Sequence, residues 1–471
     1  MRALFDDNAI DYDRDQAPVV NNQKVVVDTF MVITEVTNFD SVNEALSTMI
    51  WLDMSWTDHR IHWRPEDYGG NTQLFMNPDQ IWKPDITCYN SADGLHQFST
   101  FMGNQVYVRC NNEGFCRWTP MMRYTTTCPL HMRYFPFDTQ MCTIKLGSWV
   151  HNTDRIHFNL TTKKTDTNRF AQKNTWTLID TLQLEQIQDY TEEGDGYFQE
   201  LHFILILSRN YYQYLINVVM TVGILATVTI FSFWVPTKSG TRLSLSLSII
   251  ISVSVYQLQA SSLIPTGTDV VPAIVTFLAI LVILINFSVV VTMVNIKLEY
   301  DVQVDSPPKC ILNACIAENF IGKALSKVLR VKSSYIYEVY EDTKEKMETG
   351  KLDMTNPDEA HQLVDAEWDL VAMVMDRICM TTYGIIFLAM IIFLFAHIPT
   401  VPRQIDMYVD DLNDRYNGTS DGVAQYNCHR SSAVTRTLDP ENERPMIICD
   451  ETNPLQRLQS TLGGAIDSLL A

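Results

Sequence analysis

The sequence predicts an α+β membrane protein, in which an extracellular antiparallel β-sandwich precedes a bundle of four transmembrane helices. Three observations predict this fold. Residues 1–209 alternate short β-rich runs with turn-rich pieces, residues 210–300 are almost unbroken apolar sequence, and a fourth apolar stretch lies at 378–398. A polar, helix-compatible segment before the fourth stretch is expected to lie in the cytoplasm.

The β-sandwich is expected within residues 1–209. Between residues 24 and 208, runs rich in β-branched and aromatic residues include KVVVDTFMVITEV, NQVYVRC, TIKLGSWV, WTLIDTLQL and LHFILIL. Pieces such as RPEDYGG, NNEGF and EEGDG separate them and are typical of turns. Because many short strands need a second layer to bury their apolar faces, a single sandwich is the simplest arrangement.

Four stretches approach the length of about 20 apolar residues that a helix needs to cross a hydrocarbon core about 30 Å thick. Three of them fall in the segment 210–298, at about 211–234, 243–264 and 272–295, and the fourth is 378–398. A cytoplasmic loop at 299–377, with a membrane-associated helix, is expected between the third and fourth spans. An extracellular tail at 399–471 follows the last span.

The second span contains serines at every other position, in the stretch TRLSLSLSIIISVSV. Strict alternation is typical of a strand, but a lone strand in lipid would leave its backbone groups unpaired. A helix is therefore expected, and at about 3.6 residues per turn it places one set of residues on a face that is polar at both ends and apolar in the middle. This face contains Ser244, Ser248, Ile251, Val255, Gln259 and Ser262. Alternatively, the serines only pack this helix against its neighbours.

Charge and cysteine placement predict the orientation. Lys238 and Arg242 lie between the first two spans and further basic residues follow the third, so both segments are expected inside. Residues 1–209 and the tail are then outside, where disulfides persist. A turn at NNEGF would bring Cys110 and Cys116 together, unless Cys116 is a free core thiol, and Cys428 could bridge to Cys449 in the tail. Two sequons on the outer side predict glycosylation, at Asn159 and Asn417.

Several functional classes are excluded by what the chain lacks. We find no phosphate-binding glycine loop, no metal-spaced His/Cys cluster and no nucleophile elbow, so no enzyme activity, metal or cofactor is expected. A net charge of −20 argues against nucleic acid as a partner. No apolar leader precedes Asp6, so we expect the numbering to start near a mature end. The tail is acidic, and the alternative to a bridged tail is a disordered extension.

An ordered set of motifs resembles the Cys-loop family of pentameric ligand-gated ion channels. Cys128 and Cys142 enclose thirteen residues that contain Phe135-Pro136-Phe137-Asp138, and four spans follow. The nicotinic acetylcholine branch is resembled by WTDHRIHWRPEDYGG at 56–70, IWKPDITCYNSADG at 81–94, LGSW at 146–149 and DAEWDLVAMVMDR at 365–377. The similarity runs from about residue 24 to 398. It implies a Cys128–Cys142 disulfide and assembly with four further subunits, identical or different.

The resemblance implies a ligand site between subunits, inside a cage of aromatic rings that attracts an amine by roughly 0.5–2 kcal/mol per contact. The matching residues are Tyr89, Trp149, Tyr190 and Tyr197 on the principal face, and Trp56 on the complementary face. The adjacent cysteine pair of acetylcholine-binding alpha subunits is absent, as in invertebrate orphan subunits. Glu192 and Glu193 occupy that tip and favour a cation, unless they form only a solvated turn. Arg109 and Arg117 could instead attract a carboxylate.

The resemblance also implies how binding reaches the pore. It places Phe135, Pro136, Phe137 and Asp138, together with Arg209 and the link 265–272, at one junction by the membrane. A carboxylate beside a guanidinium would couple the parts rigidly, although Arg209 alone could be an interfacial anchor. Five copies of the second span would line the pore, with rings of Thr241 and the serines around an apolar constriction.

Selectivity is read from the rings and from the outer domain. Thr241 and Ser262 are neutral where cation-selective relatives carry acidic rings, and the anion-selective proline-alanine insertion is absent. Residues 1–209 hold 27 acidic and 17 basic side chains, a net charge of −10 that concentrates cations. We therefore expect a plasma-membrane subunit with both termini outside, gated by a small amine-like ligand and passing inorganic cations. A synaptic location, an anion channel and a non-conducting accessory subunit remain alternatives.

Overall fold

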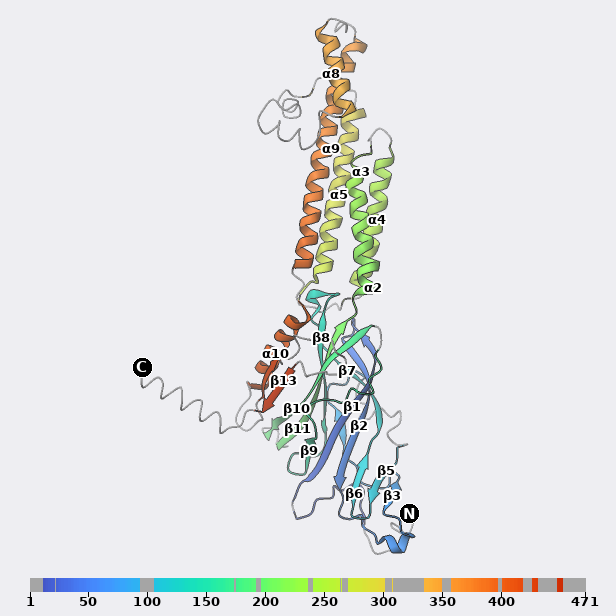
Figure 1. The fold of residues 1–471 in the computed structure, drawn as a ribbon, viewed down its shortest axis with the longest axis vertical. Helices are drawn as coiled ribbons and strands as arrows, with labels where there is room; N and C mark the ends of the chain where they lie inside the picture. The colour runs from blue at the N-terminus through green and yellow to red at the C-terminus, as the bar shows by residue number, and fades with distance from the viewer. Residues whose placement is uncertain are drawn as a thin grey trace, which may run out of the picture.

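The computed structural model places a β-sandwich at one end of an elongated molecule and a bundle of long helices at the other (Figure 1). It describes residues 12–93, 106–172, 175–191, 196–235, 240–264, 270–300, 334–349, 357–396, 400–417, 426–430 and 447–451, apart from residues 22 and 263, together with residue 307. The α+β fold that the sequence predicts, a sandwich followed by four apolar helices, is confirmed.

The sandwich consists of two sheets. The larger has the order β3-β5-β6-β2-β1-β9, with β7 also paired to β2, and the smaller has the order β10-β11-β8-β4. The strands of the larger sheet are β1 (Val25–Asp40), β2 (Ala45–Thr57), β3 (Gln73–Met76), β5 (Val108–Asn111), β6 (Phe115–Trp118), β7 (Met121–Thr127) and β9 (Ile156–Leu160). The smaller sheet contains β4 (Ile86–Cys88), β8 (Thr139–Ser148), β10 (Trp176–Tyr190) and β11 (Gly196–Arg209). Pairing is antiparallel except between β1 and β9, which run parallel.

The main core lies between these sheets. Met31 of β1 and Leu52 of β2 are completely buried, as are Ile144 of β8 and Phe203 of β11, and all belong to one apolar cluster. Short 3-10 turns at Pro65–Tyr68 and Met132–Tyr134 complete the domain. Both expected disulfides of this domain are present, Cys110–Cys116 and Cys128–Cys142, so the alternative of a free Cys116 is excluded.

The four apolar helices of the bundle are long enough to cross a membrane, at Tyr212–Ser232, Thr241–Ser261, Ala273–Lys297 and Val364–Ala396. The first comprises α2 (Tyr212–Tyr214), a π-helical turn (Leu215–Met220) and α3 (Thr221–Ser232); the others are α4 (Thr241–Ser261), α5 (Ala273–Tyr300) and α9 (Pro357–Ala396). The serine-rich stretch is thus helical. Ser248 and Ser252 donate to the carbonyls of the residues four positions earlier, at 2.8 and 2.9 Å, which satisfies both hydroxyls within the helix.

Two further segments accompany the bundle. Helix α8 (Tyr335–Glu348) packs Tyr337 and Tyr340 against Leu370 and Val374 of α9. Beyond the fourth span, α10 (Val401–Asn417) lies beside the sandwich in Figure 1, and strands β12 (Tyr426–Arg430) and β13 (Ile447–Glu451) form a separate antiparallel pair. A disordered tail is therefore a wrong interpretation for residues 401–417, because their amphipathic helix has a sheet to pack on.

Candidate functional site

The side chains of β2 alternate between the core and the outer face of the larger sheet. Leu52, Met54 and Trp56 point inward, whereas Trp51 and Asp53 point outward and are partly exposed. The Trp56 side chain is only 2% exposed, and its ring packs edge-on against Trp82 with centroids 5.8 Å apart. The structure therefore argues against a ligand-contacting role for Trp56, because a ligand between subunits cannot reach a ring enclosed in the core.

Trp51 takes the outward position that was expected of Trp56. The guanidinium of Arg169 lies over the Trp51 ring, 4.6 Å from its centroid, so this ring already accepts a cation within the chain. Sequence reasoning missed Trp51, although the period of two along a strand gives it the same parity as Asp53 and the opposite parity to Trp56. The observable signal was that Leu52 and Met54 are apolar while Asp53 and Ser55 are polar.

Arg117 of β6 lies on the same outward face and is not free to attract a carboxylate. Its guanidinium pairs with both carboxylate oxygens of Asp53, with its Nε 2.8 Å from one of them. Asp53 also accepts from the hydroxyl of Thr119 at 2.8 Å and raises the pKa of Arg117 by hydrogen bonding to it. Because the pair carries no net charge, Arg117 itself does not favour an anion.

The smaller sheet carries a second aromatic surface. Tyr89 follows β4, Trp149 follows β8, and their ring centroids are 5.8 Å apart. Tyr89 donates its hydroxyl to the carbonyl of Ser148 at 2.5 Å. Burial raises the pKa of Tyr89, and Glu200 and Tyr190 raise it further, so the phenol remains protonated near neutral pH. Trp149, by contrast, is 54% exposed and presents its ring to the outside.

Gly147 makes the close approach of Tyr89 possible. A Cβ atom at this position would lie 2.6 Å from the carbonyl oxygen of Gln199 and 2.6 Å from the Tyr89 ring. Both distances are too short for any side chain to fit without moving the strand or the ring. The glycine is therefore required by space and not by backbone conformation.

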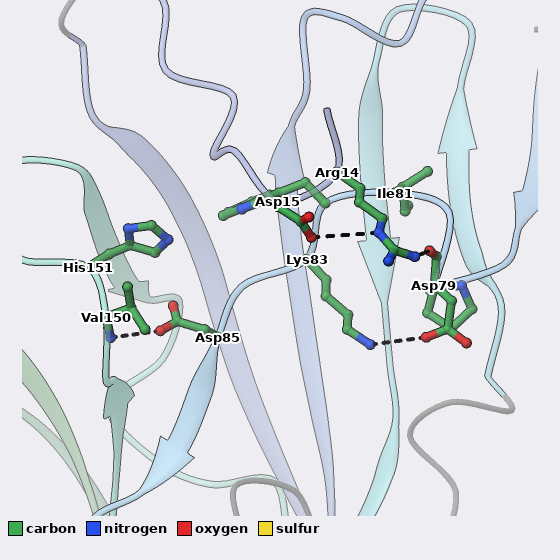
Figure 2. A pocket seen from close by; sticks show the side chains of 10 residues that line it. Arg14, Asp15, Asp79, Ile81, Lys83, Asp85, Val150 and His151 are labelled. Atoms are coloured by element: carbon green, nitrogen blue, oxygen red, sulfur yellow. Dashed lines mark hydrogen bonds and ion pairs between the residues drawn. The ribbon is translucent and has the colours of Figure 1, made fainter. Parts of the chain in front are cut away.

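Asp85 anchors the chain on either side of Trp149. Its carboxylate accepts from the Ser148 hydroxyl at 2.7 Å and from the Val150 amide at 2.9 Å. Figure 2 shows the second of these bonds beside a hollow of about 430 Å³, which Val150 and His151 border at one end. At the other end of the hollow, Lys83 pairs with Asp79 at 3.8 Å. The hollow thus adjoins the chain around Trp149.

Two more tyrosines lie at the β10–β11 end of this sheet. Tyr190 is 38% exposed and packs edge-on against Phe198, with ring centroids 5.8 Å apart, whereas Tyr197 is 50% exposed. The Tyr197 carbonyl accepts from the Thr153 amide at 2.8 Å, which ties this hairpin to the segment that follows Trp149. Glu192 and Glu193, expected to favour a cation, lie outside the described residues.

A buried ion pair lies where the sandwich meets the bundle. Arg209, at the end of β11, contacts the Asp138 carboxylate with its Nε at 2.8 Å and its second nitrogen at 3.1 Å. Three aromatic rings surround the guanidinium: Trp176 at 4.3 Å, Phe135 at 4.9 Å and Tyr214 at 5.9 Å. The guanidinium therefore joins the disulfide-closed loop, β10 and the first membrane helix.

Phe137 extends this junction toward the membrane helices. Its ring lies 4.9 Å from that of Tyr211, which precedes α2, and 6.5 Å from that of Phe395 near the end of α9. Phe135 contacts Tyr214 edge-on at 5.3 Å, next to the cis peptide bond that precedes Pro136. Residues Phe135–Asp138 thus contact both the first and the fourth spans. Most of the 265–272 link lies outside the described residues.

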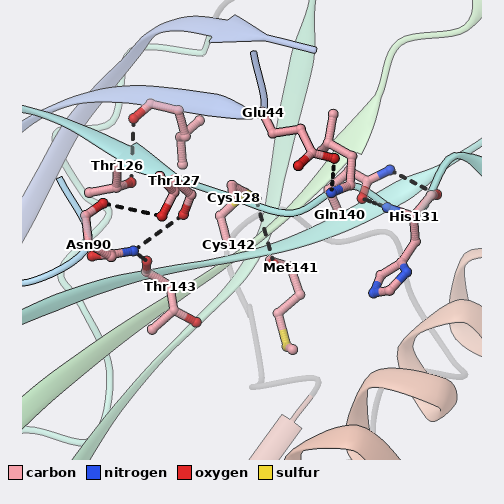
Figure 3. The surroundings of a disulfide bond; sticks show 12 residues. Glu44, Asn90, Thr126, Thr127, Cys128, His131, Gln140, Met141, Cys142 and Thr143 are labelled. Carbon is pink, nitrogen blue, oxygen red and sulfur yellow. Dashed lines mark hydrogen bonds between the residues drawn. A yellow bond between two sulfur atoms is a disulfide. The ribbon is translucent and has the colours of Figure 1, made fainter. Parts of the chain in front are cut away.

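Gln140 braces the disulfide-closed loop from within (Figure 3). Its side-chain carbonyl accepts from the His131 amide at 3.0 Å, and its nitrogen donates to the Asp138 carboxylate at 2.6 Å. Glu44, from the β1–β2 connection, accepts from the Leu130 amide at 3.3 Å with its side chain. Since the Cys128–Cys142 bond closes the same loop, Asp138 is held on a rigid support.

Helix α4 divides into a packed side and an exposed side. Buried against the other helices are Arg242, Ser246, Ile249, Val253 and Ala260. All the residues expected to line a pore are exposed in the single chain, namely Thr241, Ser244, Ser248, Ile251, Val255, Gln259 and Ser262. The expected face is therefore the one that this subunit leaves uncovered.

The inner end of α4 is locked to the fourth span. Arg242 is 1% exposed and donates two hydrogen bonds to Asp376, at 2.6 and 2.7 Å. Asn295 of α5 donates to the same carboxylate at 2.5 Å. The positive charge of Arg242 is thus directed into the bundle and neutralised there. Lys238 lies outside the described residues.

Comparisons with known proteins agree with this geometry. Residues 1–211 match the family model of the neurotransmitter-gated ion-channel ligand binding domain. Residues 1–211 are thus a ligand-binding domain of the neurotransmitter-gated ion-channel family. The chain is a multi-pass plasma-membrane protein with its ligand-binding domain outside. Among the described residues of this receptor subunit, no group of three or more acidic, histidine or cysteine side chains could hold a metal ion.

Similar proteins are nicotinic subunits. The chain is 27% identical over 356 residues to the chicken (Gallus gallus) neuronal acetylcholine receptor subunit beta-3, covering 75% of this chain and 76% of that one. It is 28% identical to the locust (Schistocerca gregaria) acetylcholine receptor subunit alpha-L1, covering 64% of this chain and 55% of that one. It is 30% identical to the mouse (Mus musculus) neuronal acetylcholine receptor subunit alpha-6, covering 61% and 58%. The chain thus spans less than two thirds of the latter two.

Proposed function

We propose that this chain is one subunit of a pentameric ligand-gated ion channel whose pore is lined by α4. The observation that carries the proposal is the division of α4, whose packed side contains Ile249 and Val253 while Ser248, Ile251 and Val255 stay uncovered. Lipid is a poor solvent for the side-chain amide of Gln259 on this face, so an assembly that encloses the face in water satisfies it. Five copies around an axis do so.

The ligand site lies between two subunits. Trp149, Tyr190 and Tyr197 are exposed on one subunit's smaller sheet, and Trp51 faces outward from the larger sheet. Since these sets stand on different sheets, a cage around one ligand needs the first set from one subunit and Trp51 from its neighbour. An amine is the ligand that such rings attract, and the Asp53–Arg117 pair removes Arg117 as a reason to expect a carboxylate.

Cations are the permeant ions in this proposal. The outer domain carries a net charge of −10, from 27 acidic and 17 basic side chains, which concentrates cations above the pore. The pairing of Arg242 with Asp376 keeps one basic side chain away from the conduction path. Substitution of external chloride should therefore leave the reversal potential unchanged, whereas replacement of sodium should shift it.

Cysteine labelling tests the pore assignment directly. Ser248→Cys should react with a membrane-impermeant thiol reagent applied from the water phase, and Ser246→Cys should not, because Ser246 is 1% exposed and faces the bundle. The two positions are two residues apart on one helix and differ in little except direction. The unsubstituted chain serves as the control and gives the background labelling of the cysteines that the sequence already contains. Equal labelling of both variants would refute the assignment.

Voltage clamp of cells expressing the chain tests gating. Biogenic amines should evoke current, and Trp51→Leu should raise the half-maximal concentration, since a desolvated cation–π contact is worth about 2 kcal/mol. Arg117→Gln tests the alternative of a carboxylate ligand: a carboxylate that bound Arg117 should lose potency in this variant, whereas an amine should not. Surface pentamers that pass current only when a second kind of subunit is added would support the accessory role.

A further inference from the structure

Helix α10 covers a face of the smaller sheet that the sandwich core does not use. Ile405, Val409 and Leu412 of α10 are 0%, 8% and 1% exposed. They pack in a separate apolar cluster against Leu182 and Leu184 of β10 and Ile204 and Ile206 of β11. Positions 405, 409 and 412 share one stripe of a helix. The segment after the fourth span is therefore an integral part of the outer domain.

The same helix holds the backbone of the junction loop on both sides of Asp138. The Gln404 side chain accepts from the Thr139 amide at 2.7 Å and donates to the Phe137 carbonyl at 2.8 Å. Tyr408 donates its hydroxyl to the Thr139 carbonyl. Both side chains are buried, Gln404 at 3% and Tyr408 at 7% exposure, so water does not replace these bonds.

The polar contacts and the ion pair form one connected unit. Asp138, between the two peptide groups that α10 holds, pairs with Arg209, which leads into the first membrane helix. The Tyr408 ring also lies 6.3 Å from that of His131 in the same loop. Burial raises the pKa of Tyr408, and the charge of Asp138 raises it further, so its hydroxyl remains a donor. Only three residues, 397–399, separate the end of α9 from Thr400, the residue before α10.

We propose that α10 is a positioning element for gating, in which Gln404 and Tyr408 set the resting position of residues Phe135–Asp138. This proposal rests on the channel function proposed above. Because α10 follows directly on α9, a shift of the fourth span against the outer domain changes the position of this loop. The fourth span thereby acts on the gate although it contributes nothing to the exposed face of α4.

Removal of these hydrogen bonds without loss of packing should loosen the resting junction. Gln404→Met keeps the length of the side chain and removes both bonds, and Tyr408→Phe removes only the hydroxyl. A loosened junction restrains the closed pore less, so more channels should open without ligand. Coupling between distant sites typically amounts to about a 5–150-fold change in an equilibrium, and a rise of about fivefold or more in ligand-independent opening is expected.

The test uses the full chain with Ile251→Thr, which adds a hydroxyl to the apolar constriction and should let it fill with water in the absence of ligand. Leak current is divided by the number of subunits at the surface, measured by biotinylation. Gln404→Met should raise this ratio about fivefold, and Tyr408→Phe should raise it in the same direction. Met407→Gln, on the exposed side of α10, should leave it unchanged.

The outcomes separate the two proposals. If Ile251→Thr passes no current at normal surface abundance, either alone or with a second kind of subunit added, the channel function fails and this inference fails with it. If Ile251→Thr conducts and Gln404→Met leaves the ratio unchanged or lowers it, the positioning role is overturned while the channel function stands. Leu412→Ala controls for simple stability, since it weakens docking away from the loop and should reduce surface abundance without raising the current per subunit.

Hydrogen exchange of the purified full chain in detergent gives a readout that needs no current. The Thr139 amide donates to the Gln404 side chain, so its exchange should accelerate in Gln404→Met and remain slow in Met407→Gln. Unchanged protection of Thr139 in Gln404→Met would show that α10 does not hold this peptide group, and would overturn the proposal.

Discussion

Replacement of Arg209 by methionine should strongly destabilise the outer domain. The substitution keeps the bulk of the side chain and removes its charge, which leaves the Asp138 carboxylate, 1% exposed, without its two bonds of 2.8 and 3.1 Å. Breaking one partner of a buried pair costs about 3–5 kcal/mol. At about 2–4 °C per kcal/mol for a domain of this size, the midpoint of thermal unfolding should fall by about 6–20 °C.

Thermal unfolding of the full chain in detergent, followed by tryptophan fluorescence, measures this effect. Trp176 is a suitable reporter because its ring lies 4.3 Å from the Arg209 guanidinium. Asp138→Asn alone should also destabilise, because it leaves a buried guanidinium unpaired. The double variant should be more stable than the sum of both losses predicts, by about 2 kcal/mol or more, since it removes both charges together. Additive losses, or a fall below about 2 °C for Arg209→Met, would refute the reasoning.

Three further predictions concern the outer domain and the tail. Gly147→Ala should lower the free energy of unfolding by about 1–3 kcal/mol through overpacking, and it should displace Tyr89 and so reduce amine potency. Gly223→Ala, with nothing within 4 Å of the added Cβ, should do neither. Thermal unfolding measures the first effect and concentration–response curves measure the second. Burial, aided by Lys24, lowers the pKa of His157 below its usual 6.5, so the unfolded chain binds this proton more readily and stability should fall as the pH drops through 6.5; His157→Gln should flatten that part of the pH–stability curve, and an unaltered slope would contradict the assignment. Cys428 and Cys449 are direct partners across β12 and β13, at a separation typical of disulfides, so peptide mapping without reduction should recover them linked, and recovery of two separate thiols would exclude the bond.

The spacing of apolar residues along the sequence predicted the sandwich and the helix bundle, because strands and helices repeat with different periods. Long apolar runs identified the spans, and the exposed face of α4 is the one that helical periodicity gave for Ser244, Ser248 and Ile251. The misplacement of Trp56 had a different origin. The motif matched the right region, but whether a side chain of β2 points into the core or outward depends on its odd or even position along the strand. That alternation places Trp51 on the surface and Trp56 in the core.

Contacts between distant segments were beyond the reach of local pattern. The bond between Asp138 and Arg209 spans 71 positions, and only the resemblance to a family brought these residues together. The stripe Ile405, Val409 and Leu412 was readable as an amphipathic helix, but nothing in it names the surface on which it packs. A hint lay in β11, where LHFILIL is apolar without alternation, as expected of a strand covered on both faces.

The covering of β11 by α10 has a consequence for how the subunit matures. A ribosome delivers the amino-terminal portion first, so Leu182 and Ile204 face water until the final span has been threaded and the polypeptide returns to the outer side. A chain truncated before residue 401 would leave this apolar face of the smaller sheet permanently exposed, and chaperones recognise such surfaces. Because α10 can pack on the sheet only after the fourth span has been inserted, the outer domain is complete only when membrane insertion has finished.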